Sequence, residues 1–381
     1  MINSREKILQ EFPVLNKVLY FNTASIGIAP DSTIKAIENF IRRYQDESIC
    51  DDAKSFQIID HCKSQIAQLI GSSIDEIALL PNTSFGINIV SHGLPFQKGD
   101  EILIPDGEFP ANVLPWKTLA KKGITINIID RIYPLLDSLK KAITPRTRAI
   151  AISAISFSDG YVIDLAALSE LCHKNNIFLA VDAIQAIGNF PIDVSELGIG
   201  LMASGAQKWQ LTPWGAGFLY VSKEFQNILD VNFEGWLSRF PERDFSNLLN
   251  YEIPYPDSAL KYECGSPVFP SLAGYENSLR ILLKTGVAKI HGNSLEIADY
   301  IIERASKYQD WEIISPIDGK NRSAIVSIKM TEANELFQFL RKRNVILSIR
   351  EGALRFAFHL YNMAEDVDRL FELVDQFYED K

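Results

Sequence analysis

Between about residue 76 and residue 221, short apolar runs recur along the chain. The runs are continuous rather than alternating, and several are rich in isoleucine. Continuous β-branched runs are typical of strands that are covered on both faces, so they predict a mostly parallel sheet. The predicted strands are residues 77–80, 102–104, 124–129, 149–152, 178–181 and 217–221.

Amphipathic stretches separate these strands. Residues 112–121 and 165–174 have the pattern of crossover helices, and residues 53–70 carry a single apolar stripe. The alternation of strands and helices predicts an α/β fold with a doubly wound sheet. Such sheets bind their ligands at the carboxyl ends of the strands. Asp182 and Ser204 both lie at such ends.

The last third of the chain has a different pattern, which predicts a small α+β domain. Its predicted elements are helical stretches over about 271–308, a strand at 324–328, a helix at 332–343, strands at 345–349 and 354–358, and a helix from Ala364. We therefore expect a large domain over residues 16–275 and a small C-terminal domain over residues 276–381. Residues 1–15 are expected to pack on the small domain.

Composition narrows the range of partners. The 38 basic and 48 acidic residues give a net charge of −10 without a basic block, which argues against nucleic acid and anionic membranes. No run approaches the ~18 apolar residues of a spanning helix, and the first residues lack an apolar signal core. Four scattered cysteines and five histidines without ligand spacing predict a cytoplasmic protein with no metal site.

One lysine and one aspartate suggest the chemistry. Lys208 follows a run of small and apolar residues, and Asp182 closes an apolar run 26 positions upstream (208 − 182). A lysine becomes a nucleophile toward carbonyl groups only when burial or a nearby positive charge destabilises its ammonium form. An acid that protonates a pyridine nitrogen is the usual companion of pyridoxal phosphate (PLP). The pair therefore predicts a PLP site.

A phosphate site is predicted where residues 81–88 follow a strand and open a helix. The free N–H groups of a helix N-terminus favour a dianion. A plain helix cap formed by Asn82 or Thr83 is the alternative. Ser204, four residues before Lys208, could add a hydroxyl to the same phosphate.

Six segments occur in the order seen in the class-V aminotransferases: residues 22–27, 82–84, 181–185, 204–209, 265–267 and 355–362. The chain resembles this family over roughly residues 18–375. Its members are PLP enzymes of fold type I, and they include cysteine desulfurases, isopenicillin N epimerase-like proteins and, more distantly, kynureninases. The resemblance implies PLP as the cofactor, a small amino acid as the substrate and a homodimer as the assembly.

The resemblance also implies which residues contact the cofactor ring. Lys208 would form the Schiff base, and Asp182 would pair with the pyridine nitrogen. Gln185 would donate a hydrogen bond to the phenolic oxygen, with Ala183 beneath the ring. Phe109 occupies the position whose side chain stacks on the ring in relatives, although a phenylalanine of the core is the alternative.

Other residues would hold the two anionic ends of the ligands. The phosphate contacts implied by the resemblance are Thr83, Ser84, Ser204 and Gln207, with Ser266 reaching across from a partner subunit. Arg355 would bind the substrate carboxylate with its bidentate fork. The loop that carries Asn22 and Ala24 would lie beside it. A structural role for Arg355, paired with Glu351 or Asp182, is the alternative.

Three departures from the family pattern concern the cofactor. Phe109 falls at the ring-stacking position, which is histidine in the desulfurases, and it resembles the Phe-Pro version of kynureninase-like members. Gln207 stands where many relatives have histidine, so a hydrogen-bond donor is kept but a titratable group is lost. Phe157 stands where relatives have asparagine, which removes one contact to the phenolic oxygen of the cofactor.

The resemblance leaves several reactions open. Desulfuration needs a mobile cysteine whose thiolate attacks sulfur, and residues 319–350, where relatives carry it, contain none. We therefore expect chemistry at the α-carbon of a small amino acid. Transamination is the favoured reaction, and a carbon–sulfur lyase or an epimerase is the alternative. A non-catalytic binding or scaffold protein is an alternative of another class.

Overall fold

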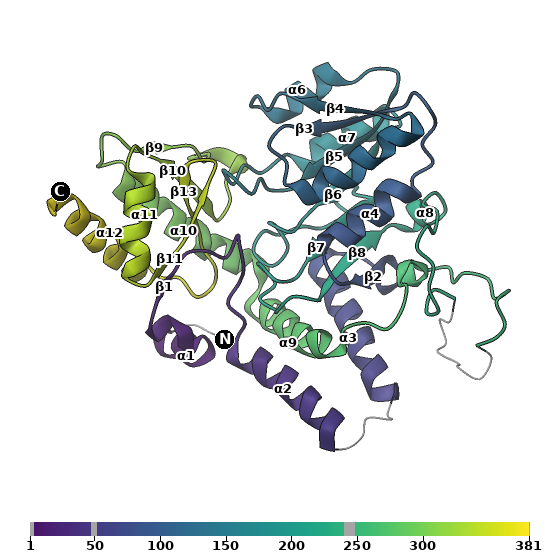
Figure 1. Cartoon of the computed structure of the whole chain (residues 1–381), viewed down its shortest axis with the longest axis horizontal. Helices are drawn as coiled ribbons and strands as arrows, with labels where there is room; N and C mark the ends of the chain where they lie inside the picture. The colour runs from purple at the N-terminus through teal and green to yellow at the C-terminus, as the bar shows by residue number, and fades with distance from the viewer. Residues whose placement is uncertain (1–3, 47–51, 240–247, 381) are drawn as a thin grey trace.

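The computed structural model describes residues 4–46, 52–239 and 248–380. Figure 1 shows two groups of elements. A seven-stranded sheet with its helices lies on one side, and the C-terminal helices and strands gather on the other together with β1 (Leu19–Tyr20).

The large sheet confirms the predicted α/β fold. Its strands in spatial order are β2 (Ile77–Leu80), β8 (Gly217–Val221), β7 (Leu201–Gly205), β6 (Phe178–Asp182), β5 (Thr147–Ser153), β3 (Glu101–Pro105) and β4 (Thr125–Ile129). The strands from β7 to β4 pair in parallel, and only β8 runs antiparallel to both of its neighbours. The sheet is therefore mostly parallel, as continuous apolar runs require.

Helices cover both faces of this sheet, which is why its central strands are buried. The helices on one face are α3 (Asp52–Ile70), α6 (Leu135–Ala142), α7 (Leu165–Lys174) and α9 (Phe269–Thr285). On the other face, α4 (Thr83–Gly93) and α5 (Leu114–Lys117) pack Ile87, Val90 and Trp116 into a second apolar cluster. Two apolar layers thus hold the carboxyl ends of the strands in place.

The C-terminal elements build a smaller sheet in the order β12 (Ser348–Arg350), β13 (Ala353–Ala357), β10 (Ile325–Lys329) and β9 (Glu312–Ile313). Its helices are α10 (Val287–Ala305), α11 (Ala333–Lys342) and α12 (Ala364–Glu379). Their apolar side chains form a separate core. This separation supports a two-domain division, which we keep as a proposal.

The first helix, α1 (Arg5–Glu11), lies beside the small domain. Arg5 forms a 2.9 Å ion pair with Asp366 at the start of α12. Ile8 and Phe12 belong to an apolar cluster that also contains Leu211 of the large domain. The N-terminal segment therefore contacts both groups of elements. No helix in the described ranges combines the length and the apolar character needed to cross a membrane.

The helical stretches expected over about 271–308 are present as α9 and α10, which are separated at Gly286, whose φ is +87°. Two other predicted elements were wrong in detail. The helix expected over residues 112–121 is only the short α5 between two 3₁₀ turns, because Pro115 lacks the N–H that a continuous helix needs there. The strand expected over 345–349 is divided into β11 (Val345–Ile346), which pairs with β1, and β12, which pairs with β13.

Candidate active site

Lys208 and Asp182 come together at the carboxyl ends of neighbouring strands. Asp182 is the last residue of β6, and Lys208 lies three residues beyond the end of β7. A loop over residues 22–27 passes directly against Lys208. Gly27 donates its N–H to the carbonyl oxygen of Gln207 at 2.9 Å, and a Cβ at Gly27 would lie 2.0 Å from the carbonyl oxygen of Lys208. Only glycine permits so close an approach of the two backbones.

Asp182 has one carboxylate oxygen without a partner. Its Oδ1 accepts a hydrogen bond from the N–H of Ile184 at 2.9 Å, whereas its buried Oδ2 has no hydrogen bond. Burial raises the pKa of Asp182, and the positive charge of Lys208 opposes that rise. A buried oxygen without a donor is costly. Its position beside Lys208 fits a site for PLP, whose pyridine N–H is the donor that Oδ2 lacks.

Lys208 lies in a buried environment under an aromatic side chain. The Lys208 side chain is buried. Burial lowers the pKa of Lys208, Asp182 opposes the fall, and Arg355 and Arg350 add to it. The Nζ atom lies 5.5 Å from the centre of the Phe109 ring, and that ring meets Phe157 edge to face at 5.3 Å. We propose that Phe109 covers the cofactor ring from this side.

The expected ring contacts Ala183 and Gln185 follow Asp182 at the same strand end. Ala183 is fully buried. Gln185 accepts a hydrogen bond from the indole N–H of Trp209 at 2.7 Å and donates its amide to the carbonyl oxygen of Ala24 at 3.0 Å. One amide hydrogen of Gln185 is left for a further acceptor. This remains compatible with the predicted contact to a phenolic oxygen.

The predicted phosphate site lies where α4 begins beside the end of β7. Asn82 caps α4 by accepting the N–H of Phe85 at 3.0 Å, so the cap that we considered as an alternative is present. The cap leaves the other first-turn N–H groups, at Thr83 and Ser84, without an intrahelical partner. Thr83 Oγ1 accepts the N–H of Gly205 at 2.8 Å, which fastens α4 to the strand. The N-terminus of α4 and the carboxyl end of β7 are therefore in direct contact.

The other predicted phosphate contacts differ in accessibility. Gln207 is half-buried, and its Oε1 would lie 2.6 Å from a Cβ at Gly205. Ser204 is fully buried, and its hydroxyl accepts a hydrogen bond from Gln210 at 2.9 Å. Its hydrogen is donated to the carbonyl oxygen of Gly205 at 3.3 Å, so a phosphate contact by Ser204 would require that hydrogen to turn away from Gly205. Ser266 is exposed.

Arg355 is fully buried and faces the loop over residues 22–27. Its guanidinium donates to Ser25 Oγ at 2.7 Å, to Ser348 Oγ at 3.2 Å and to the carbonyl oxygen of Phe157. None of these acceptors is Glu351 or Asp182, the structural partners that the sequence allowed. In the same loop, Ala24 is buried and Asn22 Oδ1 is buried without a hydrogen bond.

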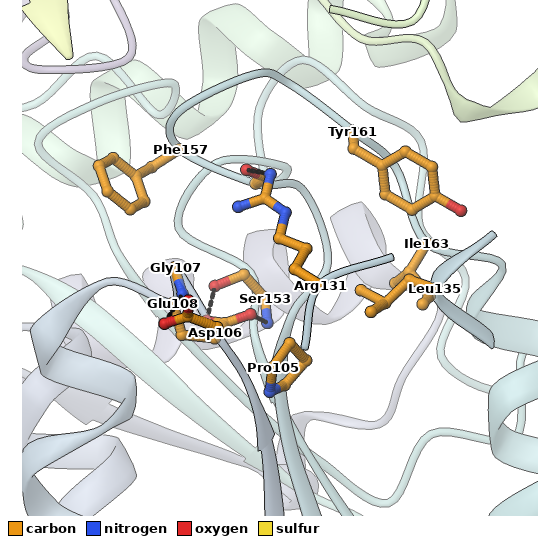
Figure 2. Close-up of a pocket in the computed structure, with 11 residues that line it drawn as sticks. Pro105, Asp106, Gly107, Glu108, Arg131, Leu135, Ser153, Phe157, Tyr161 and Ile163 are labelled. Atoms are coloured by element: carbon orange, nitrogen blue, oxygen red, sulfur yellow. Dashed lines mark hydrogen bonds between the residues drawn. The ribbon is translucent and has the colours of Figure 1, made fainter. Parts of the chain in front are cut away.

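Two charged residues near the site were missed by sequence reasoning. Arg350 donates to the same Ser25 hydroxyl at 3.2 Å. Glu108 accepts hydrogen bonds from the backbone N–H of Ser153 at 2.8 Å and from its hydroxyl at 2.5 Å, and Ser153 pairs with Asp182 across β5 and β6. Figure 2 shows this contact at a small pocket that Arg131 and Phe157 also line.

A sequence signal for Arg350 existed. Arg350 comes immediately before Glu351-Gly352, a turn dipeptide between two short strands. It also lies two residues after Ser348, so the two side chains lie on the same face of the strand. Glu108 offered no such signal, because its partner Ser153 is 45 residues away in sequence.

Comparison with known proteins gives the same assignment as the geometry. The Aminotransferase class-V family profile matches residues 19–370. An uncharacterized aminotransferase of Bacillus subtilis (strain 168) is 27% identical over 369 residues, which cover 95% of this chain and 96% of the relative. A probable cysteine desulfurase of Methanothermobacter thermautotrophicus is 23% identical, with 97% of each chain covered.

Solved structures share the fold. A cysteine desulfurase of Escherichia coli superposes with a TM-score of 0.87 at 21% identity, covering 100% of this chain and 99% of the other. A cystine C–S lyase in complex with its product, cysteine persulfide, superposes with a TM-score of 0.87 at 22% identity, covering 96% and 99%. Together with the family match over most of its length, this shows that the chain belongs to the class-V aminotransferases and is a PLP-dependent enzyme of fold type I.

Proposed function

We propose that the protein is a transaminase that moves the amino group of a small α-amino acid to a 2-oxo acid. The observation that carries the amino-acid substrate is the buried guanidinium of Arg355, which lies close enough to Lys208 to lower its pKa and, among the described residues, donates to neutral oxygens. An α-carboxylate is the partner that such a group lacks, and the bidentate fork would orient it.

Lys208 and Asp182 divide the proton chemistry. PLP, when bound, supplies an electron-withdrawing ring that stabilises negative charge at the α-carbon of the substrate. Asp182, whose buried Oδ2 has no hydrogen bond, would hold the ring nitrogen of the cofactor in its protonated form. Lys208 takes the α-proton from the substrate and returns it at another carbon, because burial favours its neutral amine. Phe109, whose ring lies 5.5 Å from Lys208 Nζ, and Phe157 would cover one side of the reacting atoms.

We further propose that the phosphate binds at the N-terminus of α4. Thr83 and Ser84 would offer N–H groups and hydroxyls there, and Gln207 would add its amide from the end of β7. Ser266 of a second subunit would complete the set. Ser204 would add its hydroxyl hydrogen, which it otherwise donates to the carbonyl oxygen of Gly205, while Gln210 holds its oxygen.

The environments of the described cysteines favour a reaction that forms no persulfide on the enzyme. Among the described residues, Cys62 and Cys172 are buried, and burial raises the pKa of both thiols. Cys264 is half-buried, and its Sγ donates to the carbonyl oxygen of Phe233. Cys50 lies outside the described residues. A thiol, unlike a thiolate, is a poor nucleophile toward sulfur.

A carbon–sulfur lyase is the second candidate, since it needs no acceptor cysteine either. Similarity in fold to a cystine C–S lyase supports this alternative. Relatives named probable cysteine desulfurases favour desulfuration instead, so that reaction must be measured. Epimerisation would share the first proton transfer but return the proton to the same carbon.

We also propose a homodimer. Ser266 lines a pocket together with Gly215 and Val268. Val268 is 49% exposed, and Trp214, the neighbour of Gly215 in sequence, is 70% exposed. Val268 also lines a groove with Ile41 and Tyr44 of α2 (Asp31–Asp46), which are 51% and 69% exposed. Exposed apolar side chains that gather along one groove favour a protein partner. A second copy of the chain fits best because the phosphate site would gain Ser266 from it.

The reaction type can be read from the products. With a panel of amino acids, formation of 2-oxo acid should require an added 2-oxo acid, and free ammonia should not accumulate. Lys208→Ala serves as the inactive control. If ammonia forms in the same amount as the 2-oxo acid, the reaction is elimination rather than transamination. Alanine together with sulfide from cysteine would instead establish desulfuration.

The lowered pKa of Lys208 predicts how the apoprotein captures PLP. Only the neutral amine attacks an aldehyde, so the rate of covalent capture should rise with pH and level off above a midpoint well below the ordinary lysine value of 10.5. Arg350→Gln removes a cation that lowers this pKa, so the midpoint should move upward. Arg341→Gln, an exposed arginine of α11, should leave it unchanged. A midpoint at or above 10.5 in the wild type would contradict the assignment.

For the dimer, sedimentation of the holoenzyme at assay concentration should give twice the mass of the chain. An interface of this kind buries ~2,000 Å² or more. Val268→Asp places a charge on the apolar surface and should shift the population to monomers that lose PLP more readily. Wild-type monomers with full activity would rule the proposal out.

A further inference from the structure

Arg350 and Arg355 meet at one hydroxyl. Both donate from Nη2 to Ser25 Oγ, at 3.2 Å and 2.7 Å. The two acceptor positions of that hydroxyl are then filled by arginines, and its own hydrogen remains available to a ligand. The arginines and Ser25 come from opposite ends of the chain, so this convergence is a product of the tertiary fold.

The register of one hairpin fixes this arrangement. Strands β12 and β13 are joined by Glu351 and Gly352, which have φ values of +48° and +79°, as a tight two-residue turn requires. Ser348 pairs with Arg355, and Arg350 lies two residues from Ser348 on the same strand. Residues two apart face the same side, so both guanidinium groups project from one face of the hairpin.

Neither arginine has a carboxylate partner within the part of the chain that the structure describes. Arg355 donates to the hydroxyls of Ser25 and Ser348 and to a backbone carbonyl oxygen. Arg350 donates to Ser25 and to its own neighbour's carbonyl oxygen, that of Ile349. The two guanidinium groups therefore repel each other, which helps to lower the pKa of Arg355, and both lower the pKa of buried Lys208.

An ordinary amino acid would neutralise only half of this charge. Its single α-carboxylate would pair with Arg355, which leaves Arg350 without an anion. Taking from the proposed function only that Arg355 holds the α-carboxylate, we propose that Arg350 binds a second acidic group. The substrate class is then an amino acid with a side-chain carboxylate, or the corresponding dicarboxylic 2-oxo acid. Ser25 lies between the two anions and can donate to either.

Binding of unreactive acids tests this inference without any turnover. Succinate and glutarate carry two carboxylates and no amino group, and butyrate carries one carboxylate. Calorimetric titration of the holoenzyme should show that at least one diacid binds roughly tenfold or more tightly than butyrate. Arg350→Gln should remove this preference and leave butyrate binding unchanged. Arg341→Gln, on the exposed end of α11 in the same domain, is the matched control and should keep the preference.

Two results would overturn the inference. The first is equal binding of diacids and butyrate by the wild type. The second is an equal loss of both kinds of acid in Arg350→Gln, which would mean that both arginines hold the same α-carboxylate. If Arg350→Gln does not fold, Arg350→Lys keeps the charge without the fork and should reduce the preference only in part. Failure of transamination in the product assay would leave these binding results interpretable, because no reaction takes place in them.

Discussion

Asp182 and Lys208 bring an acid and an amine into the same buried space, at the carboxyl ends of β6 and β7. Burial acts on them in opposite directions, since it raises the pKa of the acid and lowers that of the amine. The charge of each side chain opposes the pKa shift that burial causes in the other, so both can remain buried in the folded protein. The unpaired Oδ2 of Asp182 leaves room for one N–H donor. The remaining parts of the site are arranged around this pair.

The substrate side of the site depends on contacts between segments that are far apart in sequence. The loop over residues 22–27 joins the two domains, because Ala24 accepts from Gln185 and Ser25 accepts from Arg355. We propose that the large domain supplies the groups that act on the cofactor and that the small domain, through Arg355, holds the substrate carboxylate. A shift of the β12–β13 hairpin would then change the position of the substrate relative to Lys208.

Sequence reasoning succeeded where local chemistry determines structure. Continuous apolar runs predicted β5 and β6 because both faces of those strands are buried. It was weaker where small residues form a strand, as in β7, and where prolines break a helix pattern, as at Pro115. The pairing of Lys208 with Asp182 could be predicted because Asp182 closes an apolar run and Lys208 follows a run of small and apolar residues. The meeting of Arg350 with Ser25 could not, because it depends on hairpin register and on a contact across 325 positions.

The most direct test is to reduce the holoenzyme with borohydride and map the modified peptide by mass spectrometry. The account predicts a single PLP adduct, on Lys208, in the wild type. It also predicts that Lys208→Ala carries no adduct although it remains folded. An adduct on a different lysine, or none after the protein has been supplied with PLP, would contradict the assignment of the site at the ends of β6 and β7.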